Sequence, residues 1–213
     1  MILTKLEAQK KNKDRVSIYI DDEYAFGIDI SLVYDFKLKK GMEIDQNFID
    51  QVLLKEDEKQ AHIYALKVIN YRPRCEAEIR KKMAEKGYSR KLIDNTIDYL
   101  IENDFLNDTR FAKLYIESKL HQNQYGPNRI RYQLLQLGLD RSIVDNALRD
   151  LYENNGDYED YSEYNTALTL AKKKLSSLGN DDSAAKYRKL SGFLGRKGYS
   201  YEVISRICSE LIE

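Results

Sequence analysis

The chain has 213 residues, enough for one or two ordinary domains or for an array of small ones. Basic and acidic residues number 35 each, and a formal net charge of zero argues against a simple polyanion-coating protein. No run of about 18 apolar residues is present, which excludes a transmembrane helix. The first residues lack the apolar stretch of a signal peptide, so we expect a cytoplasmic protein.

The first 60 residues predict a small sheet followed by helices. Residues 2–9 and 15–20 alternate apolar and polar side chains, as half-buried strands do, and the pattern resumes at Tyr24 and Phe26 after an acidic turn at 21–23. We therefore expect an antiparallel sheet, a short helix over 32–36, a turn at 39–41 and a helix over 45–59.

A helical pattern then occurs three times, anchored on Gly87, Gly138 and Gly198. Apolar residues stand four and eight positions before each glycine and six, ten and thirteen after it, which places them on one face of each of two helices. Glycine adopts positive φ without penalty and ends helices, while Ser89, Asp140 and Ser200 can cap the helix that follows. The sequence therefore predicts a repeat protein.

Each repeat also has a leading helix. Ala61 and Ala65 mark the first one, which ends before Pro73; Phe111 and Ala112 mark the second; Ala167 and Ala171 mark the third. The predicted fold is mainly α: three tandem three-helix repeats in an elongated, curved array, preceded by the small sheet. The predicted domains are 1–60, 61–108, 109–153, an acidic linker over 154–163 and 164–213. Tyrosines in the linker could instead pack on a neighbouring repeat.

The sequence shows no catalytic or metal-binding pattern. His62 and His121 have no partner at ligand spacing, and no phosphate-binding glycine loop is present, so we expect neither an enzyme nor a cofactor. Cys208 stands at a core position of the third repeat, where a buried reduced thiol is expected. Cys75 lies in a basic turn and could be more reactive.

Basic residues decorate the repeats. Residues 1–60 are net acidic, whereas 61–151 and 164–213 are net basic. These cations could be a solvated helix face or a surface for nucleic-acid backbone or an acidic protein groove. Aromatic residues interleaved for base stacking are not evident. The candidate binding residues are Arg72, Arg74, Arg80, Lys81, Lys82, Lys86, Arg129, Arg131, Arg188, Lys189, Arg196 and Lys197.

Several motifs resemble the RecX family of bacterial regulatory proteins. They are YRPRC at 71–75, EIRKKM at 78–83, KG at 86–87, NDFLND at 103–108, RI at 129–130, GL at 138–139 and GFLGRKGYS at 192–200. The resemblance covers nearly the whole chain and adds Lys119, Lys172 and Lys173 to the candidate binding residues. Three departures stand out: Cys75 replaces a usual serine, Asp104 a usual glycine and Lys119 a common arginine.

The resemblance implies a monomeric, non-enzymatic regulator. Such a protein binds the filament of the RecA recombinase on single-stranded DNA and inhibits ATP hydrolysis, strand exchange and the coprotease activity of the SOS response. Weak direct binding to DNA is a further expectation, and no membrane partner is expected. The alternative is a sequence-independent nucleic-acid-binding helical repeat module, and a general protein-interaction solenoid is disfavoured by the period of about 50 residues.

Overall fold

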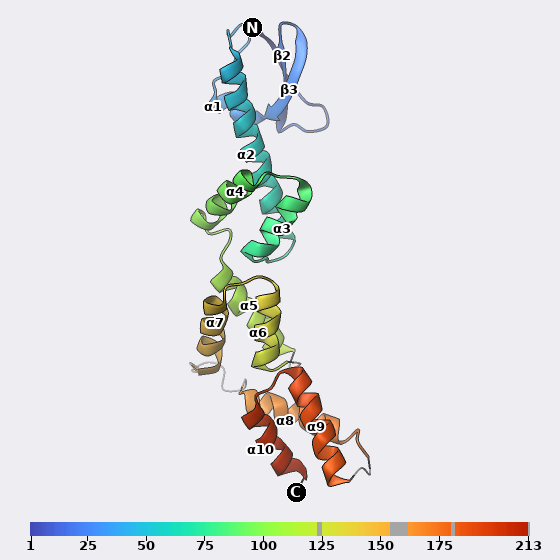
Figure 1. Cartoon of the computed structure of the whole chain (residues 1–213). Helices are drawn as coiled ribbons and strands as arrows, with labels where there is room; N and C mark the ends of the chain where they lie inside the picture. The colour runs from blue at the N-terminus through green and yellow to red at the C-terminus, as the bar shows by residue number, and fades with distance from the viewer. Residues whose placement is uncertain (123–124, 154–161, 180–181, 213) are drawn as a thin grey trace. The chain divides into compact units, whose positions relative to one another are not determined.

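The computed structural model of the chain describes residues 1–122, 125–153, 162–179 and 182–212 (Figure 1). The fold divides into two compact units. The first contains Met1–Arg72 and Arg80–Phe105, and the second contains Pro73–Ile79 and Leu106–Glu213. The predicted mainly helical fold with a small N-terminal antiparallel sheet is confirmed.

The N-terminal sheet has three antiparallel strands in the order β1-β2-β3: β1 (Leu3–Ala8), β2 (Arg15–Ile20) and β3 (Glu23–Asp29). The β2–β3 turn contains Asp21 and Asp22, with φ of 49° and 67°. Aspartate tolerates this left-handed conformation better than most residues, and such turns match the twist of a hairpin. The acidic residues that interrupt the alternating pattern therefore form the turn that the sequence predicts.

The sheet packs on α1 (Ile30–Asp35) and on the first half of α2 (Gln46–Tyr71), with Leu3, Ile18 and Val52 among the buried residues of this cluster. Glu56 of α2 is buried there as well. Its carboxylate lies 2.7 Å from the Arg15 guanidinium and accepts a 2.7 Å hydrogen bond from the Asp29 N–H. The buried charge is thus both paired and hydrogen-bonded, as burial requires.

The expectation of separate helices over 45–59 and from Ala61 onward was wrong, because α2 is one helix of 26 residues. No glycine or proline interrupts 46–71, so nothing in the backbone stops the helix between the two predicted segments. Asp45 caps its start by accepting from the Phe48 N–H, and it ends at Tyr71, two residues before Pro73.

Each repeat contains, in the predicted order, a helix, a glycine and a second helix. All three glycines have positive φ, at 94°, 91° and 87° for Gly87, Gly138 and Gly198. Ser89 and Asp140 accept N–H hydrogen bonds at the start of the helix that follows, as expected, and the Ser200 N–H donates to Glu163. The helices are α3 (Glu76–Lys86), α4 (Arg90–Glu102), α5 (Asp108–His121), α6 (Pro127–Gln136), α7 (Arg141–Glu153), α8 (Glu163–Leu175), α9 (Ser183–Lys197) and α10 (Tyr201–Ile212).

The predicted apolar register before the glycines is confirmed, and after them it is confirmed except that Leu151 and Leu211 are only partly buried. The residues four positions before the glycines, Met83, Leu134 and Leu194, are fully buried. Those eight positions before, Ile79, Ile130 and Leu190, are fully buried too. The acidic linker falls mostly on residues 154–161, which lie outside the described part, so it stays a prediction, as do the domain limits.

Candidate nucleic-acid interface

Two of the predicted binding residues are held by aspartates of their own repeat. Arg80 pairs with Asp94, and the Arg131 Nε lies 2.8 Å from the Asp145 carboxylate. Each pair joins the position seven before the glycine to the position seven after it. The Arg131 hydrogen bond holds the pKa of Asp145 below its usual value. Half-exposed pairs of this kind contribute about 0–1 kcal/mol, and they tie the second helix of a repeat to the third.

The third repeat lacks this pair, because Ser191 and Ser205 occupy the two positions. In repeat register no position carries a candidate cation in all three copies. The candidates recur only in pairs, which are Arg80 with Arg131, Arg129 with Lys189, and Lys86 with Lys197. Equivalent positions therefore do not carry a cation through all three repeats, and the position of Arg80 and Arg131 serves to hold two helices of a repeat together.

The remaining candidate residues differ in exposure. Arg74 is largely buried and pairs with Glu78 at 3.2 Å, and Lys82 pairs with Glu85 at 3.3 Å. Lys119 is half-buried, and its ammonium lies 5.3 Å from the Tyr115 ring centre. The exposed candidates are Arg72, Lys81, Lys86, Arg129, Lys172, Lys173, Arg188, Lys189 and Arg196.

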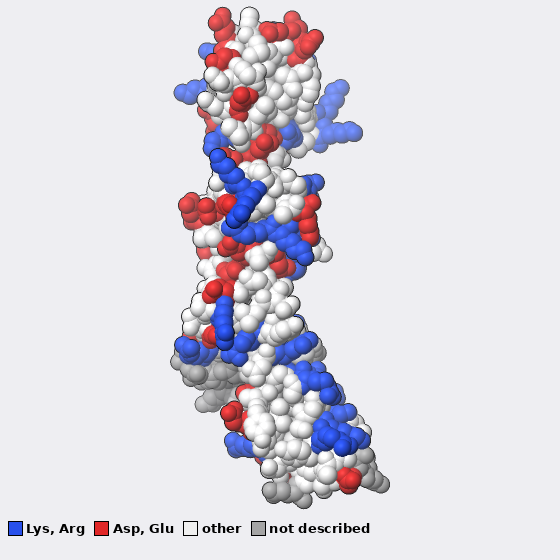
Figure 2. Space-filling view, in the orientation of Figure 1, with Lys and Arg blue, Asp and Glu red and all other residues white. Residues whose placement is uncertain are grey.

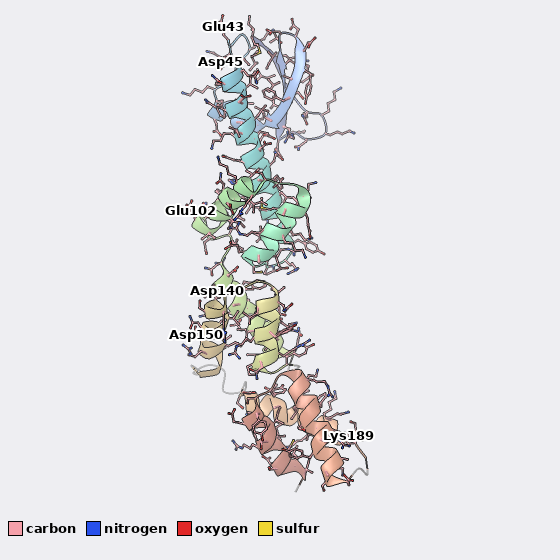
Figure 3. All side chains as sticks on the ribbon, viewed as in Figure 1. Glu43, Asp45, Glu102, Asp140, Asp150 and Lys189 are labelled. Atoms are coloured by element: carbon pink, nitrogen blue, oxygen red, sulfur yellow. The ribbon has the colours of Figure 1, made fainter. Side chains whose placement is uncertain are left out.

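Exposed cations gather on α9 within the second compact unit. Figure 2 shows Lys and Arg side chains along α9 on the face in view. Lys189 projects from this helix in Figure 3, whereas the labelled acids Asp140 and Asp150 lie at α7. Asp150 pairs there with Lys113 at 3.0 Å. Helix α9 thus carries cations and no carboxylate, whereas α7 carries both signs of charge.

The second and third repeats meet where the start of α6 contacts the end of α9. The N–H groups of Gly126 and Asn128 donate to the carbonyls of Lys197 and Gly198, at 2.9 and 3.1 Å. The first N–H groups of a helix and the last carbonyls of another lack partners within their own helices. Each helix end here satisfies the other, with the positive end of one dipole against the negative end of the other.

Two glycines make this contact possible. A Cβ at Gly126 would lie 2.5 Å from the Gly198 carbonyl oxygen, and a Cβ at Gly198 would lie 2.3 Å from the Arg129 nitrogen. Both obstacles are backbone atoms, which cannot move aside without separating the helices. The second and third repeats are therefore joined by a glycine crossing, meaning the contact of Gly126 with Gly198.

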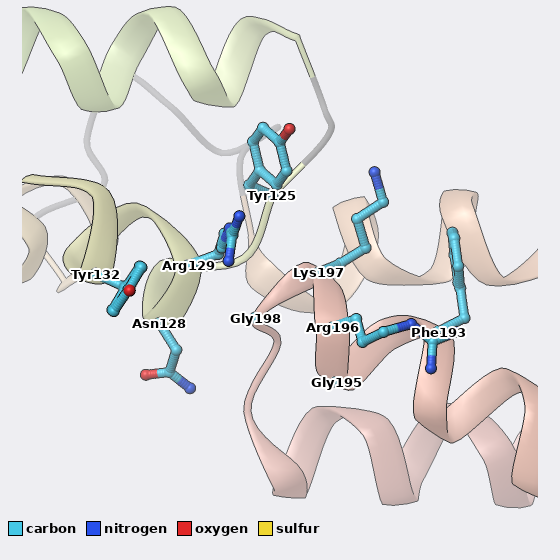
Figure 4. A pocket seen from close by; sticks show the side chains of 9 residues that line it. All are labelled: Tyr125, Asn128, Arg129, Tyr132, Phe193, Gly195, Arg196, Lys197 and Gly198. Carbon is cyan, nitrogen blue, oxygen red and sulfur yellow. The ribbon is translucent and has the colours of Figure 1, made fainter. Parts of the chain in front are cut away.

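A hollow of about 740 Å³ lies beside the glycine crossing (Figure 4). Among the described residues it is lined by Tyr125, Asn128, Arg129, Tyr132, Phe193, Gly195, Arg196, Lys197 and Gly198. Three of these are cations, three are aromatic, and none is acidic. The ammonium of Lys197 is 5.0 Å from the Tyr125 ring centre and 5.9 Å from that of Phe193.

Aromatic rings and cations therefore lie together here, a combination that was not evident in the sequence. The sequence pattern did not reveal this hollow because its lining comes from two repeats that are far apart in sequence. Tyr125 and Tyr132 belong to the second repeat, and Phe193 and Lys197 belong to the third. A local signal did exist: Tyr125 precedes Gly126-Pro127, and Lys197 precedes Gly198, the two glycines that cross.

Cys75 is buried, so the alternative of a reactive thiol is not supported. Its S–H donates to the Leu137 carbonyl at 3.3 Å, and burial raises its pKa to about 11. Little thiolate, the reactive form, exists at neutral pH. Cys208 is also buried, as expected for a core thiol, and burial raises its pKa too.

The described residues include no group of three His, Cys, Asp or Glu side chains able to hold a metal ion. The side chain of His121 lies outside the described part, and His62 stacks on Tyr99 with ring centres 3.9 Å apart. In the same part of the chain, every helix is too short or too polar to cross a membrane.

Four family models match the chain in order. The regulatory protein RecX N-terminal domain matches residues 1–45, and the first, second and third three-helix domains of RecX match 61–100, 107–148 and 161–208. Together they span most of the chain.

Comparison with full-length proteins gives the same family. Regulatory protein RecX of Clostridium acetobutylicum is 36% identical over 209 residues, covering 98% of this chain and 95% of that protein. Its counterpart in Clostridioides difficile is 32% identical over 211 residues, covering 99% and 96%. A crystal structure of regulatory protein RecX superposes with a TM-score of 0.81 at 26% identity, covering 98% of this chain and all of that one. With its sheet, its three glycine-centred repeats and these matches over its full length, the chain belongs to the RecX family of regulatory proteins.

Proposed function

We propose that this protein is a non-enzymatic regulator that binds the RecA recombinase filament on single-stranded DNA and inhibits its activities. These activities are ATP hydrolysis, strand exchange and the coprotease function that triggers the SOS response. The observation that supports the proposal is the match of nearly the whole chain to the RecX family of regulatory proteins. The cytoplasm, where the filament forms, is the proposed location, and a monomer is the proposed state.

The proposed contact surface consists of the exposed cations, which are spread over all three repeats. A filament offers phosphate and acidic protein surface many times over, so weak contacts by several repeats add to a high avidity. Arg74, Arg80, Lys82 and Arg131 already hold carboxylates of this chain, and we place them at the margin of the contact. Its centre comprises Arg72, Lys81, Lys86, Arg129, Lys172, Lys173, Arg188, Lys189 and Arg196. Lys119 and Lys197, both half-buried beside aromatic rings, belong to the margin as well.

The test is inhibition of the DNA-dependent ATPase and of strand exchange with purified bacterial RecA. We expect inhibition at a protein concentration well below that of the recombinase, because one regulator that touches several protomers affects more than one of them. Full ATPase and strand-exchange rates under these conditions would refute the proposal. Equal affinity for coated and bare strands, without inhibition, would indicate the simple nucleic-acid-binding module instead.

The charge requirement is tested by reversal of one exposed cation in each repeat, Lys81→Glu with Arg129→Glu and Arg188→Glu. We expect inhibitory potency to fall by about 3- to 150-fold, since each exposed charge pair contributes about 0.2–1 kcal/mol and three are reversed together. The matched control reverses Lys10, Lys11 and Lys13, which are equally exposed between β1 and β2. Circular dichroism should show the helical content of both variants unchanged. Equal potency of the two variants would show that the repeat cations only solvate the surface.

A further inference from the structure

The hollow beside the glycine crossing combines the two kinds of groups that bind a nucleotide. Cations from both repeats, Arg129 from α6 and Arg196 from α9, reach it, and both are exposed. Among the described residues neither forms an ion pair, and no carboxylate lines the hollow. Its positive charge is therefore available to a phosphate.

The aromatic residues of the hollow divide into structural and accessible ones. Tyr125 and Phe193 flank the ammonium of Lys197, so a cation–π contact inside the protein accounts for these three side chains. Tyr132 is different. It is 54% exposed, and its ring lies beside the Arg129 guanidinium, 5.7 Å from ring centre to carbon. This cation–π contact is made at the surface, so more than half of the tyrosine stays open to a ligand.

We propose that this hollow binds one nucleotide of a single nucleic-acid strand, with its base stacked on Tyr132 and its phosphates at Arg129 and Arg196. The volume lies within the range of small-molecule sites. Stacking on an aromatic ring and backbone cations are the usual means of holding single strands without regard to sequence. A duplex is excluded from this mode, because its bases are already stacked and do not expose their faces.

The glycine crossing keeps the two sides of the hollow in register. Arg129 and Tyr132 belong to α6 and Arg196 belongs to α9, and backbone hydrogen bonds join the start of α6 to the end of α9 next to these residues in the chain. Fixed groups lose little conformational freedom on binding. The inference deepens the proposed function, on which it rests for the biological source of the strand, by giving this chain a site for the strand itself.

The stacking part is tested with two strands of about 15 nucleotides, oligo(dT) and a chain of abasic nucleotides with the same phosphates. Fluorescence anisotropy should show that Tyr132→Leu weakens oligo(dT) binding by about 5- to 150-fold, the effect of losing one stacked base. It should leave abasic binding unchanged. The control is Tyr187→Leu on α9, an exposed tyrosine outside the hollow, which should bind both strands as the native protein does.

The charge part is tested by salt titration. Arg129→Ala with Arg196→Ala should weaken binding of both strands and reduce the slope of log K against log salt by about 1.4, or about 0.7 for each phosphate that is no longer neutralised. The control, Lys10→Ala with Lys11→Ala, removes two exposed cations between β1 and β2, outside the hollow and outside the proposed contact surface, and should leave the slope nearly unchanged.

A direct reading of the stack is available because the chain contains no Trp. Tyr132→Trp introduces a single indole, whose fluorescence oligo(dT) should quench and the abasic strand should not. Equal losses for oligo(dT) and abasic strands in Tyr132→Leu, or equal slopes in the two double variants, would overturn the proposal. The proposal would also be overturned if the variants of the hollow lost affinity for polyglutamate, an acidic polypeptide, but kept their affinity for oligo(dT). None of these measurements uses the recombinase, so their outcome is independent of the outcome of the inhibition assay.

Discussion

At the scale of single residues, one position of the repeat makes the same kind of contact in two copies but uses a different donor group in each. Cys75 and Gly126 stand at the same place, twelve residues before the glycine, and each directly precedes the second helix of its repeat. Gly126 donates its N–H to Lys197, whereas Cys75 donates its S–H to Leu137. Both positions therefore bind a carbonyl at the end of another repeat's second helix, one through backbone and one through a side chain.

The environment of Cys75 predicts low thiol reactivity. In a Cys208→Ala variant, which leaves Cys75 as the only thiol, the alkylation rate at pH 8 should be about 100-fold below that of an ordinary thiol, because the pKa rises from 9.0 to about 11. Since thiolate forms only as pH approaches the raised pKa, the rate should keep increasing above pH 9. Iodoacetamide labelling measures it, with the denatured variant as the control. A native rate that levels off near pH 9 would contradict the burial.

Part of the residue-scale picture could be foreseen from the sequence. The buried side chains at the repeat positions follow from spacing alone, because helix periodicity is local. The fate of the arginines could not be foreseen in this way. Arg129 and Arg131 are two residues apart and look alike in sequence, yet one lines the hollow while the other meets Asp145 on a different helix. Only tertiary contacts distinguish them.

At the scale of helices, the same positive-φ glycine works in three different surroundings. A Cβ at Gly87 would meet nothing within 4 Å, one at Gly138 would lie 2.6 Å from the Ala77 Cβ, and one at Gly198 would strike the backbone of Arg129. Gly87 thus serves only the turn. Gly138 and Gly198 serve the turn and, in addition, the close approach of a second helix.

Gly126→Ala separates close approach from backbone strain, because Gly126 has φ of −83°, which alanine also adopts. We expect a loss of about 1–3 kcal/mol in unfolding free energy, since overpacking against the Gly198 and Tyr199 backbone forces α6 away from α9. Urea denaturation measures the loss, and hydrogen exchange of the Asn128 amide should speed up.

The matched control is Gly87→Ala, which has positive φ but open space around it. Its cost should be about 1–2 kcal/mol, from the left-handed backbone alone, with Asn128 exchange unchanged. Native exchange at Asn128 in Gly126→Ala would show that the glycine crossing tolerates a side chain.

Sequence periodicity predicted the helices but not all of their limits. The single helix α2 was expected as two because its two halves serve different cores: Val52 packs under the sheet, whereas Ala65 is buried further along. A change in the buried face looks like a break when only the pattern is read. The absence of glycine and proline over 46–71 is the signal that should have decided it.

At the scale of the whole molecule, the hydrophobic residues form separate clusters. One lies under the sheet and includes Ile28 and Val52, another includes Ile116 and Leu134 of the second repeat, and another includes Leu190 and Leu194 of the third. Small cores of this kind stabilise their own repeat and its neighbours rather than the whole chain. Stability is therefore expected to be local.

Leu134→Asp tests this local stability. A carboxylate at a fully buried position loses its water without gaining a partner, which costs more than about 3 kcal/mol. Hydrogen exchange with mass spectrometry should show reduced protection in α5, α6 and α7, with β1–β3 and the first half of α2 still protected. Reduced protection in the sheet as well would mean that the chain unfolds as one cooperative body.

The start of α9 differs from the starts of α3 and α6 in a way that bears on how such chains can lengthen. At α3 and α6, donors of Cys75, Gly126 and Asn128 are taken by carbonyls of another copy. At α9, the carboxylate of Asp182 accepts the Ala185 N–H at 2.6 Å, so this terminus is closed by its own residue. In register with Cys75 and Gly126, twelve residues before Gly198, stands Lys186, which lies inside α9 rather than directly before it. Gene duplication that appended one more copy could therefore not simply reuse the same joint; evolution, or an engineer extending the series, would first have to remove the extra first turn of α9 together with its Asp182 cap.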